Sequence, residues 1–190
     1  MTKDLVLAFS PIYVGVMGPG NATVKQAEDA YHLGKEIRAR KWILVSGGTN
    51  KGVMKEVNRG ACYMAREIAK KLGISDPAEI NPMAISILPE SGRSQNSPYD
   101  RLSIPTGVGQ GRNAINIHSS DYVIAFEGGS PGTSSEISLA IKLNKPVILL
   151  NPSELTENYF TKMDSKLVHV AKDVGAVLAI VERLITTSKL

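Results

Sequence analysis

The sequence predicts an α/β protein with a Rossmann-like, doubly wound parallel sheet in a three-layer α/β/α sandwich. Three observations support this fold class. Short apolar runs of strand length alternate with longer segments in which apolar residues recur at helical spacing. Glycine-rich turns follow directly after several of these apolar runs. The 190 residues, 43% hydrophobic and 21% charged, have the composition of an ordinary globular protein, so we expect a single domain over residues 1–190.

The first half of the chain contains three strand-like runs separated by two helical segments. The runs are too short for helices, whereas the longer segments place apolar residues three and four positions apart. In order, we predict a strand at 12–17, a helix at 22–40, a strand at 42–45, a helix at 52–72 and a strand at 84–88. Strands that alternate with helices imply right-handed crossovers and therefore parallel pairing.

The second half continues the alternation after a long polar segment, 89–109. Loops of that length inside a compact domain are usually functional lids or partner contacts, or else disordered, and the sequence leaves these alternatives open. Periodicity then predicts a helix at 111–119, a strand at 122–126, a helix through 137–143, strands at 146–150 and 167–170, and a helix at 173–185.

The composition argues against several classes of partner and cofactor. The net charge of +4 is scattered, and only three Phe and one Trp are available for base stacking, so we expect no nucleic-acid partner. No apolar run approaches the length of a membrane span, so we expect no membrane partner. The single cysteine, Cys62, excludes an internal disulfide and favours a cytoplasmic location. The three histidines lack partners at ligand spacing, so we expect no metal site.

The most informative segment is the glycine-rich turn after the fourth predicted strand. It contains Gly128, Gly129 and Gly132, with Thr133 at the start of the next helix. Glycines let backbone N–H groups approach a phosphate closely, and the helix N-terminus adds partial positive charge. Glu136 lies about one turn into that helix, where its carboxylate can face whatever the phosphate carries. We therefore expect an anion cradle with a carboxylate beside it.

Two further glycine-rich turns, 18–20 and 47–52, follow the first and second strands. The carboxyl ends of parallel strands share one edge of a doubly wound sheet, and ligands bind at that edge. We therefore expect Gly18, Gly47 and Gly48 to contribute to the same site. The alternative for the last two glycines is a simple tight turn.

The familiar nucleotide-binding signatures are absent. Gly47 and Gly52 have the spacing of a P-loop, but Val53 and Met54 stand where Lys and Ser or Thr are needed. No acidic residue ends the second strand to hold an adenine ribose, so NAD binding of the Rossmann type is not expected. No Gly-x-Ser-x-Gly nucleophile elbow follows a strand.

The order of the glycine-rich motifs resembles the Lonely Guy (LOG), or "lysine decarboxylase-like", superfamily. The similar segments are Gly-Gly-x-x-Gly-Thr-x-x-Glu at 128–136, Gly111-Arg112-Asn113, Ser120-Asp121 and the earlier stretches 33–36 and 45–54. The resemblance covers about residues 12–151 and implies a Rossmann-like fold. LOG enzymes are phosphoribohydrolases, not lysine decarboxylases, and they cut nucleoside 5′-monophosphates into base and ribose 5-phosphate. A sister branch consists of molybdenum-cofactor carrier proteins.

The resemblance implies catalytic roles for Arg112 and Glu136, which fall on the catalytic arginine and glutamate of LOG enzymes. Cleavage of an N-glycosidic bond builds positive charge on the ribose, which a carboxylate stabilises. An arginine can hold the phosphate or the departing base with directed donors. Ordinary structural roles are the alternatives. Glu136 could simply favour a helix start, and Arg112 could pair with Asp121 or Glu127. Thr133 could be only a helix cap.

Two departures from the LOG pattern favour the carrier branch. LOG enzymes have Met-His-x-Arg-Lys around the arginine, whereas this chain has Gly-Gln-Gly-Arg-Asn at 109–113. The LOG turn is Pro-Gly-Gly-x-Gly-Thr. Here Glu127 replaces the proline, and one extra residue precedes Gly132. Glu127 adds negative charge, which would weaken a phosphate site unless a cation pairs with it. Carrier proteins share the Arg-Asn and Gly-Gly-x-x-Gly-Thr arrangement, so Asn113 joins the expected binding residues.

The sequence therefore predicts a protein that binds a phosphate-bearing small molecule, as a carrier or sensor, at the C-terminal edge of its sheet. The expected ligand is a nucleoside monophosphate or the molybdenum cofactor. One alternative is a LOG-like phosphoribohydrolase, and a weaker one is a vestigial site with a role in assembly. The resemblance implies a homodimer or homotetramer, although the residues alone would permit a monomer.

Overall fold

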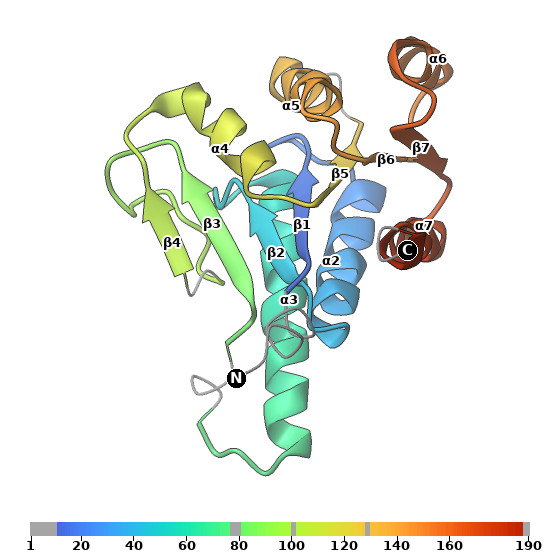
Figure 1. Cartoon of the computed structure of the whole chain (residues 1–190). Helices are drawn as coiled ribbons and strands as arrows, with labels where there is room; N and C mark the ends of the chain where they lie inside the picture. Colours follow the sequence, from blue (N-terminus) through green and yellow to red (C-terminus); the bar gives the residue numbers. More distant parts are fainter. Residues whose placement is uncertain (1–10, 77–80, 100–101, 128–129, 188–190) are drawn as a thin grey trace, which may run out of the picture.

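A seven-stranded parallel sheet forms the centre of the computed structural model, which describes residues 11–76, 81–99, 102–127 and 130–187 (Figure 1). The strands are β1 (Tyr13–Met17), β2 (Ile43–Ser46), β3 (Ala84–Leu88), β4 (Leu102–Pro105), β5 (Tyr122–Phe126), β6 (Val147–Leu150) and β7 (Val168–Ala171). Their order across the sheet is β4-β3-β2-β1-β5-β6-β7. The chain adds strands outward from β1 toward one edge as far as β4, and then adds β5 to β7 on the other side of β1. The predicted doubly wound parallel sheet is confirmed.

Helices cover both faces of the sheet and complete the three layers (Figure 1). On one face lie α2 (Val24–Ala39), α3 (Gly52–Lys71) and α7 (Val174–Thr187), and on the other lie α4 (Arg112–His118), α5 (Pro131–Lys142) and α6 (Glu154–Met163). Strand β5, in the interior of the sheet, shows how the two cores form. Ile124 and Phe126 pack against the first set of helices, whereas Val123 and Ala125 pack against the second. Successive residues of a strand point to opposite faces, so a strand buried on both sides reads as a continuous apolar run.

The register of the strands brings the relevant chain ends level. Val16 of β1 pairs with Ser46 of β2, and Met17 pairs with Ala125 of β5. The turns that follow β1, β2 and β5 therefore emerge side by side at the C-terminal edge of the sheet. The reversal of strand order at β1 and β5 opens a crevice at this edge, where ligands of doubly wound proteins bind.

Two elements were missed by the sequence-based prediction. Segment 89–109 was expected to lack regular structure, but its residues Leu102–Pro105 form the edge strand β4. The side chains of Leu102 and Ile104 in this strand are about half exposed, so the sequence contains no buried apolar run at this position. Helix α6 was also missed, because Phe160 is the one fully buried residue along it. Ser153 caps α6 by accepting a hydrogen bond from the Thr156 N–H group.

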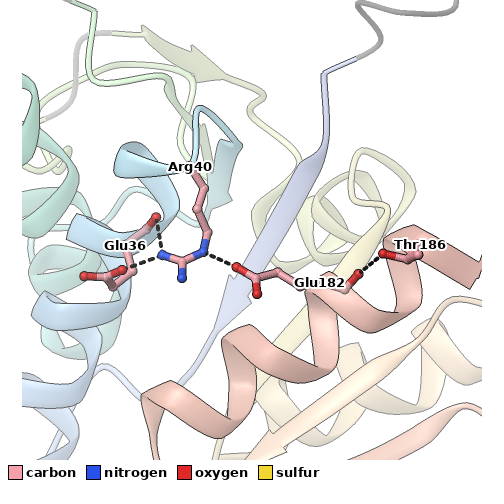
Figure 2. Close-up of polar contacts among 4 residues, drawn as sticks. All are labelled: Glu36, Arg40, Glu182 and Thr186. Carbon is pink, nitrogen blue, oxygen red and sulfur yellow. Dashed lines mark hydrogen bonds and ion pairs between the residues drawn. The ribbon is translucent and has the colours of Figure 1, made fainter.

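A surface network ties α2 to α7 (Figure 2). Arg40, which follows α2, donates through Nε to Glu182 Oε1 at 2.7 Å and through Nη1 to the Glu36 carboxylate. Thr186 Oγ1 donates to the Glu182 carbonyl oxygen at 2.9 Å. Ion pairs between partly exposed side chains contribute little, so this network adds little to the stability of the fold. Within the described ranges, no helix is both long enough and apolar enough to cross a membrane.

Candidate ligand-binding site

A cavity of about 280 Å³ lies at the C-terminal edge of the sheet, between the turns after β1, β2 and β3 and the first turns of α4 and α5. Seven of the sequence-predicted site residues line it: Gly18, Gly47, Arg112, Asn113, Gly132, Thr133 and Glu136. Gly128 and Gly129 lie outside the described residues. The cavity therefore occupies the crevice at the reversal of strand order, where a doubly wound sheet binds its ligands.

The two glycines of the turn after β2 have different roles. Gly47 lies against the Arg112 guanidinium, because a Cβ atom at this position would stand 2.0 Å from Arg112 Nη1. Gly48 is not among the cavity-lining residues. It has a positive φ of 65°, and a Cβ atom there would stand 2.4 Å from Ser86 Cβ. Gly48 thus serves the tight turn itself, whereas Gly47 makes room for a side chain of the site.

Arg112 is the first residue of α4 and is only 7% exposed. Its Nη1 donates to the Ile87 carbonyl oxygen at 2.9 Å, and Nη2 lies 4.0 Å from Met54 Sδ. Its Nε is buried without a partner. Burial lowers the pKa of Arg112, while the nearby carboxylates of Glu136 and Glu90 raise it. Because an arginine keeps its proton in proteins, the site contains a permanent cation that is hydrogen-bonded to the end of β3.

Arg112 forms neither of the ion pairs considered as alternatives from the sequence. Asp121 accepts a hydrogen bond from the Tyr13 N–H group at 2.8 Å. Glu127 faces the start of α6 instead, where it accepts hydrogen bonds from the hydroxyl groups of Ser153, at 2.5 Å, and Thr156, at 2.6 Å, and from the Ser153 N–H group. Glu127 does not line the cavity, and N–H and hydroxyl groups at the start of α6, rather than a cation, stabilise its charge.

Glu136 is 7% exposed and projects from α5 into the cavity. Asn116 Nδ2 donates to Glu136 Oε1 at 3.3 Å. Burial raises the pKa of Glu136 to about 7, although the hydrogen bond from Asn116 and the charge of Arg112 act in the opposite direction. Glu136 lies beyond the first turn of α5, so its role is not to favour the helix start. Its carboxyl group can exchange a proton near neutral pH.

The N-terminus of α5 opens onto the same cavity. Ser130 is the N-cap residue, but its side chain accepts no capping hydrogen bond, and Pro131 follows it. Gly132 and Thr133 come next, and N–H groups in a first helical turn have no partner within the helix. Thr133 is not the cap, and its buried Oγ1 has no partner. This arrangement can bind an anion through the helix N-terminus.

Unpartnered polar atoms concentrate at the cavity. In the described part of the chain six buried side-chain atoms lack a hydrogen-bond partner, and four of them belong to cavity-lining residues: Glu90 Oε2, Arg112 Nε, Asn116 Oδ1 and Thr133 Oγ1. Leaving a buried polar group unpaired costs about 1–3 kcal/mol, so native proteins rarely gather several in one place. The cavity therefore has the hydrogen-bonding capacity of a ligand site.

Sequence reasoning missed Glu90 and Asn116. A signal for Asn116 was available, because it lies four residues after Arg112 and thus on the same face of α4. A weaker signal existed for Glu90, which follows the end of β3 just as the glycine-rich turns follow β1 and β2. Among the described residues, no group of three His, Cys, Asp or Glu side chains is placed to hold a metal ion.

Comparison with known proteins places the chain in a family. The model of the SLOG cluster4 family matches residues 11–178. An uncharacterised protein of Archaeoglobus fulgidus is 33% identical over 144 residues, which cover 76% of this chain and 83% of that protein.

Solved structures that are similar over almost their whole length include two molybdenum cofactor proteins. The molybdenum cofactor binding protein of the phototrophic bacterium Rippkaea orientalis is 36% identical with a TM-score of 0.79, covering 93% of this chain and 99% of that one. The molybdenum cofactor carrier protein of Chlamydomonas reinhardtii is also 36% identical, with a TM-score of 0.75 and the same coverage. These similarities confirm the resemblance to the LOG-like superfamily and its molybdenum-cofactor carrier-like branch, and the chain belongs to the SLOG cluster4 family.

Proposed function

We propose that this protein binds a phosphate-bearing, molybdopterin-like ligand in the cavity between α4 and α5 and acts as its carrier. The observation that carries the proposal is the group of four unpartnered buried polar atoms beside the N-terminus of α5. The residues present suit such a ligand, because the helix N-terminus can hold a phosphate and the polar side chains can bind a heterocycle. The names of the similar structures support this class of ligand.

Retention of molybdenum by the purified protein tests this proposal. The protein is mixed anaerobically with molybdenum cofactor released from a molybdoenzyme and then separated by gel filtration, and bound molybdenum is measured by mass spectrometry. Thr133→Val removes a hydroxyl group of the cavity, and Thr161→Val is its matched control, because Thr161 Oγ1 is also buried and unpartnered but does not line the cavity. We expect about fivefold weaker retention by the Thr133 variant alone. Equal retention by both variants would contradict the proposed location.

Nucleoside-monophosphate hydrolysis is the second candidate, favoured by one observation. Glu136 and Arg112 share the cavity, and burial raises the pKa of Glu136 to about 7, within the range of a working acid or base. A glycosidic-bond hydrolase needs such a carboxylate near the ribose. Release of free base from AMP or other nucleoside monophosphates, abolished by Glu136→Gln, would establish hydrolysis and displace the carrier proposal. Ligand retention without base release would favour the carrier.

Self-association is a separate proposal, supported by the apolar edge of the sheet. Leu102 and Ile104 are 47% and 46% exposed, and both lie on β4, an edge strand of the sheet. An edge strand presents unpaired N–H and C=O groups that can pair with another chain, and apolar side chains on it can pack in the same contact. We propose that a second copy of the chain covers them, consistent with the expected homodimer or homotetramer. Light scattering on the purified protein measures the mass directly, and a monomeric mass would contradict this proposal.

A further inference from the structure

The polar groups around the cavity divide by hydrogen-bonding type. Donors lie at the N-terminus of α5, in the first-turn N–H groups, and at Arg112 Nε. The atoms that can only accept and lack a partner are Glu90 Oε2 and Asn116 Oδ1, whereas the unpartnered Thr133 hydroxyl can donate or accept. A ligand that satisfies the cavity must therefore present acceptors, such as phosphate oxygens, to the first set and N–H donors to the second.

Asn116 is 1% exposed, and Glu136 determines how its amide group is turned. Asn116 Nδ2 donates to Glu136 Oε1 at 3.3 Å. While Glu136 is ionised, reversing the amide would place Asn116 Oδ1 against the Glu136 carboxylate and would lose this hydrogen bond. Asn116 Oδ1 therefore remains an acceptor, and only a donor that enters the cavity can satisfy it.

Glu90 is held in place by its backbone rather than by its carboxylate. The Gly107 N–H group donates to the Glu90 carbonyl oxygen at 3.0 Å, and the Gly109 N–H group donates to the Pro89 carbonyl oxygen at 2.9 Å. Across the described ranges, the ion pairs within 4.0 Å do not include Glu90. Glu90 thus has a buried carboxylate oxygen without a partner. Its backbone is already hydrogen-bonded, so a ligand can bind the carboxylate without moving the main chain.

We propose that Glu90 and Asn116 bind the donor edge of a 2-amino-4-oxopyrimidine ring, the group that pterins and guanine share. This proposal rests on the proposed function and names the part of the ligand that the acceptors recognise. The edge carries a ring N–H group beside an amino group, and these donors match the two unpartnered acceptors, Glu90 Oε2 and Asn116 Oδ1. A phosphate elsewhere on the same ligand would bind at the N-terminus of α5.

Purine nucleotides distinguish this edge from its near relatives. Hypoxanthine keeps the ring N–H group but lacks the amino group. Adenine presents an amino donor beside a ring nitrogen whose lone pair would face a carboxylate oxygen. Because a hydrogen bond to a charged group is lost in each comparison, GMP should bind about 10- to 100-fold more tightly than AMP, with IMP between them.

Calorimetric titration with GMP, IMP and AMP tests the proposal. The three ligands carry the same ribose and phosphate, so differences in their dissociation constants report the base edge alone. In Glu90→Gln we expect the preference for GMP over AMP to fall to within about threefold, with weaker binding of GMP and no loss of affinity for AMP. Glu154→Gln, an exposed carboxylate on α6, is the matched control and should keep the wild-type preference. Thermal unfolding of each variant verifies that the fold is intact.

A second pair of ligands identifies the source of the edge. Guanosine and 6-hydroxymethylpterin both lack phosphate and carry the same donor edge, so the one that binds more tightly shows whether a guanine or a pterin compound is the better fit. The binding of both ligands should be weaker in Glu90→Gln than in the wild type. Equal affinity for GMP and AMP, an equal loss of all three nucleotides in Glu90→Gln, or no binding of GMP and the pterin would overturn the inference. Molybdenum retention by the wild-type protein in the same experiments would leave the proposed function standing. Its absence would reject the carrier function, and a preference for GMP that depends on Glu90 would then still support the donor edge.

Discussion

Replacing Gly47 by alanine should expel the Arg112 guanidinium from its place at the end of β3. The added Cβ atom would stand 2.0 Å from Arg112 Nη1, 2.6 Å from Cζ and 2.7 Å from Nη2. Atoms cannot remain at these separations, and the flexible arginine side chain moves more easily than the turn after β2. Nη1 would then lose its hydrogen bond to the Ile87 carbonyl oxygen.

The expected loss of stability follows from that hydrogen bond. A hydrogen bond to a charged group contributes roughly 1.5–3 kcal/mol to the free energy of unfolding. In a domain of this size each kcal/mol lowers the melting temperature by roughly 2–4 °C, so we expect Gly47→Ala to melt roughly 3–12 °C below the wild type. Ligand retention should fall as well, because the displaced guanidinium would leave its position in the cavity wall.

A double-mutant cycle isolates the contact between the two residues. Arg112→Ala removes the side chain that the new methyl group would strike, so Gly47→Ala made in that background should cost under about 0.5 kcal/mol. Gly92→Ala is the control, because a Cβ atom there meets no atom within 4 Å and its φ is not positive. Thermal or urea unfolding measures all four proteins and the control. Additive losses for the two substitutions would refute the argument that Gly47 makes room for Arg112.

Three further predictions concern other parts of the molecule. Burial raises the pKa of Glu136 from 4.5 to about 7, so the native state binds more protons than the unfolded state in this interval. The free energy of unfolding of the wild type, relative to that of Glu136→Gln, should therefore be greatest below pH about 4.5 and should fall as the pH rises to about 7. If urea unfolding gave the same difference between the two proteins across this range, the raised pKa of Glu136 would be contradicted. Arg40→Ala should lower the free energy of unfolding by under about 1 kcal/mol, because its ion pairs are on the surface, and a larger loss in the same assay would show that the network is more than a surface contact. Replacing both Leu102 and Ile104 by lysine should reduce the mass measured by light scattering if β4 mediates self-association, and an unchanged oligomer would exclude that edge.

The sequence predicted most of the sheet, and the errors have a common physical cause. Strand β5 was recognisable because both of its faces are buried, so every residue in it is apolar. Strand β4 was not, because it is only four residues long and its side chains Leu102 and Ile104 are half exposed, so it contains no buried apolar run. Helix α6 was not predicted for the same reason, since it buries little of its surface. Periodicity reports burial, and elements that bury little leave a weak pattern.

For the candidate site, the sequence by itself determined which turns follow which strands, and thus that Gly18, Gly47 and the start of α5 meet at one edge. These features are local, since they depend on glycine, on periodicity and on the rule that parallel strands share their carboxyl ends. Only the tertiary structure decided that Glu127 turns away to α6, and that Glu90 and Asn116 face the cavity with unpartnered acceptors. A local pattern can place Asn116 on the same helix face as Arg112, but burial, hydrogen-bond partners and the pKa of a buried carboxyl group depend on neighbours that are distant in the sequence.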